Sequence, residues 1–176
     1  MHNADNNNWL ACTGQSGLLS DTLQFRTITD QDMDFLAKLY ASTRWEELQK
    51  APWDDAQRFA FLNEQFNAQH THYQSHYPHA EYLIIQQLKE PIGRIYLDRD
   101  DTSICLIDIA LLPEHKGQGI GTQLLKELLT EAQRDNKKVT IHVENFNPAY
   151  HWYVKHGFQQ KEDRGVYQYM EWYPSN

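Results

Sequence analysis

A glycine-rich segment in the second half of the chain constrains the fold more than any other feature. It reads KGQGIG at residues 116–121, follows the apolar run ICLIDIALL and precedes a leucine-rich stretch. Glycine lets the backbone approach a ligand closely, and the first turn of a helix offers unpaired N–H groups and a partial positive charge. A strand that turns through such a loop into a helix therefore predicts a phosphate site.

Several interpretations of this loop compete. A nucleotide-hydrolase P-loop needs a Lys directly after its last glycine, and here Thr122 follows Gly121, so this interpretation fails. A dinucleotide site needs Gly-x-Gly-x-x-Gly in a parallel βαβ unit, and both the spacing and the preceding hairpin strands disfavour it. A glycine-rich turn without a ligand stays open, as does a phosphate site of another fold.

The hydrophobic pattern predicts the order strand, two helices, three strands, helix, strand, helix and two strands. LQFRTI at residues 23–28 alternates as a strand, and capping patterns open helices after Thr29 and at Asp54, with Trp45 in the loop between them. YLIIQQL, IGRIYLD and ICLIDIALL are rich in β-branched residues, and the turn-like KEP and DRDDTS separate them, which indicates hairpins. We therefore expect an α+β, or mixed α/β, fold with a largely antiparallel central sheet.

Composition and charge exclude several classes of protein. The chain has 176 residues, of which 40% are hydrophobic, and this suits one compact domain. Its formal charge of −8 disfavours nucleic acid and anionic membranes as partners, because both require clustered Lys and Arg. No apolar stretch reaches the ~20 residues of a membrane span, and we see no signal-peptide pattern. With two cysteines, Cys12 and Cys105, a reducing cytoplasmic setting is expected.

Two motifs give the loop a specific family resemblance. LLPEHKGQGIGTQLL resembles the pyrophosphate loop of the GNAT superfamily of acyl-CoA-dependent N-acetyltransferases, although Lys116 stands where Arg or Gln is usual. Farther along, NPAYHWYVKHGF resembles the family signature Asn-x-Ala-x-x-x-Tyr-x-x-x-Gly-Phe, with Asn147, Tyr153 and Gly157 in register. The resemblance implies a GNAT-like acyl-CoA N-acyltransferase fold, with a twisted sheet flanked by helices.

The resemblance also implies a domain organisation and a cofactor. Residues 23–176 would form a single N-acetyltransferase domain after a flexible tail of residues 1–22. Acetyl-CoA would be the co-substrate, without a metal. The strand that carries Ile109 would present its backbone to the pantetheine arm, polarise the thioester carbonyl through an N–H group and separate from residues 139–143. The cofactor-binding candidates are Ile109, Ala110, Leu111, Lys116, Gly117, Gln118, Gly119, Ile120, Gly121, Thr122, Asn147 and Tyr153.

Acetyl transfer to an amine requires an oxyanion donor, a neutral amine and an acid for the sulfur. By resemblance, Tyr153 is the candidate general acid, and the alternative is a packed aromatic on a short helix. Asn147 either contacts the cofactor or caps that helix. An alkylamine with a pKa near ~10 must lose a proton before it attacks. Asp108 and Glu144 are candidate bases, yet each also fits an ion-paired carboxylate, and a water relay is a further alternative.

Three other residue groups complete the sequence-based prediction. The histidines between residues 70 and 79 lack a His-Glu-x-x-His pattern and a third ligand, so we expect no metal. Cys105 fits a buried strand residue better than a nucleophile. Trp45, Phe66 and Tyr73 fall where the family usually builds its acceptor pocket and are the substrate-binding candidates, although aromatics at such spacings are also typical of a core.

Two functional hypotheses follow. The first is an enzyme that acetylates a primary amine of a small molecule, protein or peptide by direct attack, with a homodimer allowed. The second is a non-catalytic acyl-CoA-binding or sensing module on the same fold. Thiol release from acetyl-CoA in the presence of an amine distinguishes them.

Overall fold

The computed structural model describes residues 22–176, so the predicted tail lies outside the described residues except for Thr22. The chain divides into two compact units. The first contains the described residues up to Tyr96 together with Asp108–Gly121, and the second contains Leu97–Ile107 together with Thr122–Asn176.

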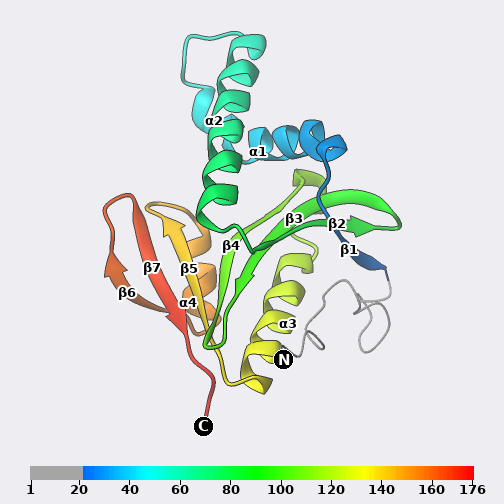
Figure 1. The fold of residues 1–176 in the computed structure, drawn as a ribbon. Helices are drawn as coiled ribbons and strands as arrows, with labels where there is room; N and C mark the ends of the chain where they lie inside the picture. Colours follow the sequence, from blue (N-terminus) through cyan, green and yellow to red (C-terminus); the bar gives the residue numbers. More distant parts are fainter. Residues whose placement is uncertain (1–21) are drawn as a thin grey trace. The chain divides into compact units, whose positions relative to one another are not determined.

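The order of the elements confirms the predicted one (Figure 1). They are β1 (Leu23–Thr27), a 3-10 turn (Asp30–Asp32), α1 (Met33–Leu48), α2 (Asp55–His76), β2 (Glu81–Gln87), β3 (Glu90–Arg99), β4 (Ser103–Leu111), a 3-10 turn (Pro113–His115), α3 (Ile120–Arg134), β5 (Lys138–Glu144), α4 (Ala149–Lys155), β6 (Gln159–Asp163) and β7 (Tyr167–Trp172).

The strands form one mixed sheet of seven in the order β1-β2-β3-β4-β5-β7-β6. The β4–β5 pair is parallel, whereas the β1–β2, β5–β7 and β6–β7 pairs are antiparallel. A loop of two residues connects β2 to β3, and such a loop can join only antiparallel strands. The prediction of a largely antiparallel sheet is therefore confirmed.

Both predicted helix starts in the first unit are confirmed. Thr29 and Asp32 form a capping box, in which the Thr29 N–H donates to the Asp32 carboxylate. Ahead of α2, the Asp54 N–H donates to the Gln57 side chain, and the Gln57 N–H donates to the Asp54 carboxylate. The prediction that Trp45 lies in a loop is wrong, because α1 continues to Leu48. No Gly or Pro interrupts this helix, and Trp45 packs against the apolar cluster that α1 and α2 share.

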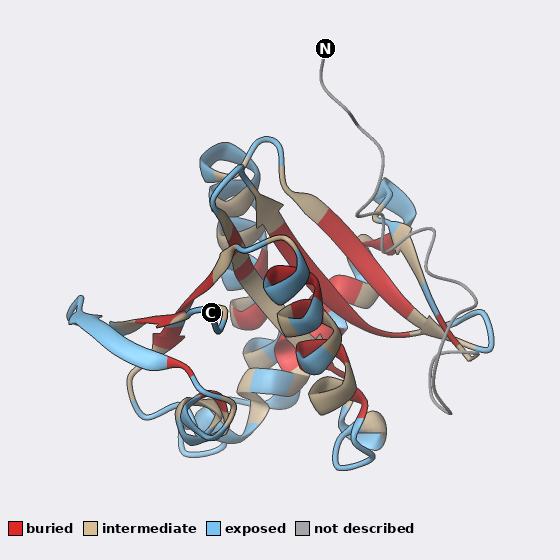
Figure 2. Ribbon diagram, turned by 90° about the horizontal axis from the view of Figure 1, so that it is seen from below, coloured by how far each residue is buried: buried red, intermediate tan, exposed pale blue. Residues whose placement is uncertain are grey.

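Each unit has its own buried apolar set, and Figure 2 shows buried residues along the central strands and on one face of the helices. In the first unit, α1 and α2 pack through Leu36, Tyr40, Leu62 and Phe66, all buried, with Ile84 of β2 beneath them. The leucine-rich stretch after the glycine-rich loop forms α3 and is amphipathic. Its buried members are Ile120, Leu124, Leu125, Leu128 and Ala132.

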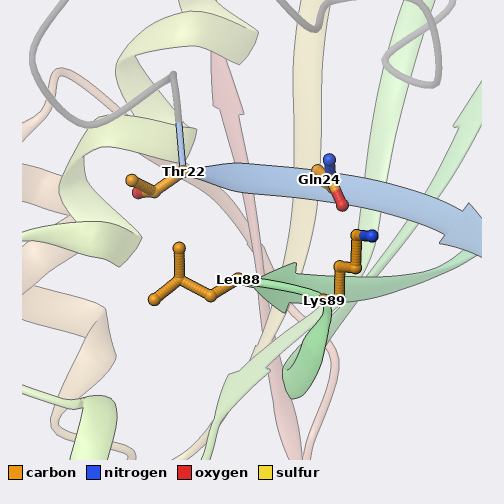
Figure 3. A pocket seen from close by; sticks show the side chains of 4 residues that line it. All are labelled: Thr22, Gln24, Leu88 and Lys89. Atoms are coloured by element: carbon orange, nitrogen blue, oxygen red, sulfur yellow. The ribbon is translucent and has the colours of Figure 1, made fainter.

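The turn between β2 and β3 differs from the predicted KEP. Glu90 and Pro91 already belong to β3, and the turn consists of Leu88 and Lys89, whose φ angles are +51° and +70°. Positive φ at both central residues is the signature of a type I′ turn, which normally uses Asn-Gly. These two residues line a surface depression together with Thr22 and Gln24 (Figure 3).

Relieving this turn should stabilise the fold. The left-handed conformation costs a residue with a Cβ atom roughly 1–2 kcal/mol. We expect the double variant Leu88→Asn with Lys89→Gly to raise the free energy of unfolding by about 1–2 kcal/mol, measured by urea denaturation. Leu88→Ala is the control, because it shortens an exposed side chain and keeps the unfavourable φ. An equal gain in that control would contradict the explanation.

Candidate active site

The glycine-rich loop lies between the second 3-10 turn and α3. Gly117 has φ of +73° and Gly119 has φ of +83°, a region that side chains rarely adopt. A Cβ atom added to either residue would meet no heavy atom of the described protein within 4 Å. The glycines are therefore required by the backbone conformation, and the space beside them is open.

The loop also presents hydrogen-bond donors. Within residues 22–176, the backbone N–H groups of Gly117, Gln118 and Gly119 donate to no protein acceptor, and the first N–H groups of α3 have no partner within the helix. The side-chain amide of Gln118 donates to the Glu114 carbonyl at 2.9 Å, which ties the loop to the preceding turn. Lys116 adds a positive charge that forms no ion pair among the described residues. This donor set fits a pyrophosphate.

The predicted separation of β4, the strand before the loop, from β5 is found only in part. Parallel pairing joins Ser103–Leu106 of β4 to Lys138–Ile141 of β5, so Val139 is paired with Ile104. The predicted separation therefore does not hold at Val139 or Ile141 and can begin only after Leu106. The following residues Ile109 and Ala110 are half-buried, and Leu111 is buried.

Gly93 of β3 fixes this part of β4, which sequence reasoning missed. A Cβ atom at Gly93 would lie less than 3.0 Å from the carbonyl oxygen of Ala110 and from Cδ2 of Leu111. Beside this contact, the Leu112 N–H donates a hydrogen bond of 2.8 Å to the Ile92 carbonyl, which keeps the two segments together. Only glycine allows β3 to approach the cofactor-binding candidates of β4 this closely.

Gly93→Ala should therefore destabilise the protein although alanine is small. Its methyl group would meet a backbone carbonyl, which cannot rotate away as a flexible side chain would. We expect a loss of about 1–3 kcal/mol in the free energy of unfolding, the usual cost of overpacking a core. Urea denaturation measures the change, and a free energy equal to that of the wild type would contradict the close approach.

Tyr153, the candidate acid, lies on α4 and is 7% exposed. Its ring centroid is 4.9 Å from that of Trp152 and 5.4 Å from that of Phe158. Its carbonyl accepts the N–H groups of His156 and Phe158, where Gly157, at φ of +94°, ends the helix. Tyr153 is therefore packed on a short helix, and its acid role stays a prediction.

The two asparagines before α4 have structural partners. The Oδ1 atom of Asn147 accepts the Ala149 N–H at 2.9 Å, which is the capping role that the sequence allowed. The side-chain amide of Asn145 donates to the Gly165 carbonyl and accepts from Gln168. Cofactor contact through Asn147 stays a prediction, and its Nδ2 atom is the group that can make it.

Trp152 is a second residue that sequence reasoning missed. Its indole Nε1 donates to the Thr122 Oγ1 atom at 3.3 Å, which links α4 to the first turn of α3 within the second unit. Trp152 directly precedes Tyr153 in the NPAYHWYVKHGF motif, so its position in the sequence was the available signal.

The most developed polar cluster lies in the first unit around Asp108, one of the candidate bases. Its Oδ2 atom accepts hydrogen bonds from Arg94 Nη2 at 2.8 Å and from the Tyr73 hydroxyl at 3.3 Å. Arg94 also donates to Gln69 at 2.9 Å, and its guanidinium lies 4.9 Å from the Tyr96 ring centroid. The structure therefore brings together Asp108 and Tyr73, which were predicted separately.

Burial and charge act against each other in this cluster. Burial lowers the pKa of Arg94, but the Asp108 carboxylate together with Tyr96 and Tyr73 raises the pKa above its usual value. Burial raises the pKa of Tyr96 to about 12, although the Arg94 charge opposes the rise. Burial, followed by the same Arg94 charge, lowers the pKa of His70. Arg94 is thus a permanent cation at neutral pH, and His70 is held neutral.

The other candidates differ in their surroundings. Glu144 ends β5, belongs to the second unit and is half-buried, and its carbonyl accepts the Asn147 N–H at 3.1 Å. Phe66 is 1% exposed and lies in the α1–α2 cluster, and Trp45 packs against that cluster. Among the substrate-binding candidates, Tyr73 contacts the polar cluster directly. Cys105 of β4 is half-buried, not buried as predicted.

Among the described residues, no group of three or more His, Cys, Asp or Glu side chains could hold a metal ion. His72 and His76 instead stack with ring centroids 5.5 Å apart. Within residues 22–176, no helix has both the length and the apolar character needed to cross a membrane.

The sequence matches the model of the acetyltransferase (GNAT) family over residues 43–158. This match spans more than half of the chain, and the chain therefore belongs to the GNAT acetyltransferase family. A search of curated proteins finds no match.

Solved structures are similar in fold. The PaiA N-acetyltransferase of Thermoplasma acidophilum in complex with coenzyme A has a TM-score of 0.63 at 18% identity, with 86% of this chain and 99% of that chain covered. A GNAT acetyltransferase of Elizabethkingia anophelis with acetyl-CoA bound has a TM-score of 0.54 at 18% identity, covering 87% and 99%. A chimera of the spermidine N-acetyltransferase SpeG from Vibrio cholerae and hSSAT has a TM-score of 0.55 at 21% identity, covering 86% and 95%. At these identities the likeness shows the fold alone.

Proposed function

We propose that this chain is an enzyme that transfers an acetyl group from acetyl-CoA to a primary amine by direct attack. The observation that carries the proposal is the loop at Gly117 and Gly119. Its φ angles are positive, its N–H groups donate to no acceptor within residues 22–176, and a helix begins directly after it. Membership of the GNAT acetyltransferase family and the fold shared with structures that hold coenzyme A or acetyl-CoA support it.

The glycine-rich loop and the end of β4 supply the residues that would bind acetyl-CoA. The N–H groups of Gly117 to Thr122, with the charge of Lys116, would bind the pyrophosphate. The backbone of Ile109 to Leu111 would bind the pantetheine arm and polarise the thioester carbonyl. Lys116 lacks the planar guanidinium of Arg, but the proposed binding of the pyrophosphate is mainly through backbone N–H groups.

The remaining residues would act on protons and on the acceptor. When bound, acetyl-CoA supplies the acetyl group as a thioester, whose carbon–sulfur bond breaks as the carbon–nitrogen bond to the amine forms. Tyr153 would hold a proton at its hydroxyl for the departing sulfur. Water or a carboxylate of the site would accept the proton that the amine gives up. Water then returns a proton to Tyr153.

The acceptor would be a primary amine of a small molecule or of a protein or peptide. The formal charge of −8 supports a cationic acceptor, since opposite charges attract over the surface. Two cysteines in the whole sequence support a reducing cytoplasmic setting.

A thiol-release assay tests the proposal. The protein is incubated with acetyl-CoA and a panel of amines, including polyamines, amino acids and lysine-containing peptides, and free thiol is followed over time. We expect release that depends on the amine and on the protein concentration. Acetyl-CoA binding without thiol release on the whole panel would contradict the enzyme and support a binding module.

A further inference from the structure

A buried ion pair beside the candidate base carries an inference that rests on the proposed function. We propose that Arg94 is a positioning residue, which holds the Asp108 carboxylate through Oδ2 so that its Oδ1 atom binds the protonated amino group of the acceptor. Asp108 is then the recognition group for a cationic amine, and it does not serve as the base.

The hydrogen bonds of Asp108 divide its two oxygens. Arg94 Nη2 and the Tyr73 hydroxyl both donate to Oδ2, whereas Oδ1 accepts no hydrogen bond from residues 22–176. A carboxylate held through one oxygen keeps a fixed orientation, and its second oxygen can accept a charge-assisted hydrogen bond from an ammonium group.

The exposure of the two side chains decides whether Arg94 or Asp108 would contact the amine acceptor. The Arg94 side chain is 3% exposed, and that of Asp108 is 17% exposed. The cation is therefore hidden behind the carboxylate, and an incoming molecule meets the negative end of the pair. A buried Arg of this kind serves its carboxylate partner and cannot itself bind an acceptor in water.

The described groups that bond to Arg94 or shift its pKa include no carboxylate other than Asp108. Arg94 makes no second ion pair within the described chain. The polar and titratable groups around the pair come from α2, β2 and β3, and they are Gln69, His70, Tyr73, Tyr82 and Tyr96. Burial and the Arg94 charge hold His70 neutral. Among these named groups, Arg94 and Asp108 are the two that form the ion pair.

Three buried atoms of the same cluster have no hydrogen-bond partner among the described residues, namely Arg94 Nε, Tyr96 Oη and His70 Nδ1. Buried polar atoms in native proteins nearly always have a partner, so such atoms on adjoining side chains indicate a place for water or a polar ligand group. This is a second and independent sign that the cluster receives something other than protein atoms.

The consequence for the reaction is a separation of roles. The Oδ2 atom of Asp108 already accepts from Arg94 and Tyr73, which leaves Oδ1 to hold the ammonium group. Asp108 would bind and orient the ammonium group, and the proton would pass to water before the nitrogen attacks.

The test compares amine kinetics in three variants. Arg94→Met removes the charge, Arg94→Lys keeps it, and Arg99→Met breaks the other buried pair of β3, in which Arg99 contacts Glu131 at 2.7 Å. We expect Arg94→Met to raise the KM for the amine about tenfold, with the KM for acetyl-CoA unchanged. Arg94→Lys should restore most of the lost affinity for the amine. Arg99→Met should lower the melting temperature only.

The outcomes separate this inference from the proposed function. A KM for the amine in Arg94→Met that equals that of Arg99→Met would overturn the positioning role. If Arg94→Met does not fold, Asp108→Asn keeps the shape and removes the charge, and an unchanged KM for the amine would overturn the inference. A wild-type protein without turnover contradicts the proposed function instead. Calorimetric titration of the amine into wild type and Asp108→Asn then still tests recognition, and equal affinities would contradict it.

Discussion

Gly119→Glu should abolish acetyl-CoA binding. The residue has φ of +83°, and space beside it is open, so the new carboxylate would stand where the pyrophosphate is proposed to bind. Like charges repel strongly at such a site, and the left-handed backbone adds roughly 1–2 kcal/mol of strain. We expect a loss of affinity of at least about 100-fold, which corresponds to about 2.8 kcal/mol, measured by isothermal titration calorimetry.

A matched variant separates charge at the loop from backbone strain. Gly165, between β6 and β7, has φ of +79° and also has open space for a Cβ atom. Gly165→Glu therefore carries the same strain and the same added charge, but away from the proposed pyrophosphate loop in the sequence. It should lose some stability and keep its affinity. Unchanged binding in Gly119→Glu would remove the loop from the donor site.

Tyr153→Phe should lower turnover by about 100-fold and leave the affinity for acetyl-CoA nearly intact. The substitution removes only the hydroxyl, which would protonate the departing sulfur, and general acid catalysis typically contributes about 10²–10⁴-fold. The ring keeps its contacts with Trp152 and Phe158. Steady-state kinetics with a reactive amine measure kcat, and calorimetry measures the affinity.

Tyr150→Phe is the control for this substitution. Tyr150 lies on the same helix, and its hydroxyl donates to Gln160 at 2.9 Å on the surface. Its loss should change neither turnover nor binding beyond a small factor. Equal turnover in Tyr153→Phe and in the wild type would show that Tyr153 is a packing residue only.

Local signals in the sequence predicted much of the fold. Thr29 with Asp32 and Asp54 with Gln57 form capping boxes because each pattern satisfies backbone groups within four residues. Gly157 ends α4 through its own positive φ. Such features depend on neighbours in the chain, so the sequence alone determines them.

The errors have equally physical causes. Trp45 continues α1 because no helix-breaking residue precedes it, and a cluster of aromatics is no sign of a loop. The turn of β2 and β3 falls on Leu88 and Lys89, which are poor turn formers, so the sequence pointed to Pro91 instead. Register in the sheet outweighed local turn preference there.

The candidate site was predictable where the family motifs lie and less so elsewhere. Arg94 and Asp108 each interrupt an apolar strand, and a charge in such a run requires a partner. That requirement could have suggested the pair, but the sequence does not reveal which strands are adjacent or their register. The close approach of Gly93 to Ala110 is likewise a contact between strands, and no local pattern announces it.

The most direct test of the proposed acetyltransferase activity follows the acetyl group itself. Acetyl-CoA carrying an isotope label in the acetyl group is incubated with the protein and an amine acceptor, and the products are identified by mass spectrometry. We predict label in an amide on the acceptor nitrogen, in amounts equal to the free thiol released and strongly reduced in Gly119→Glu. Thiol release without labelled amide, or no transfer to any amine despite tight acetyl-CoA binding, would contradict the proposed function.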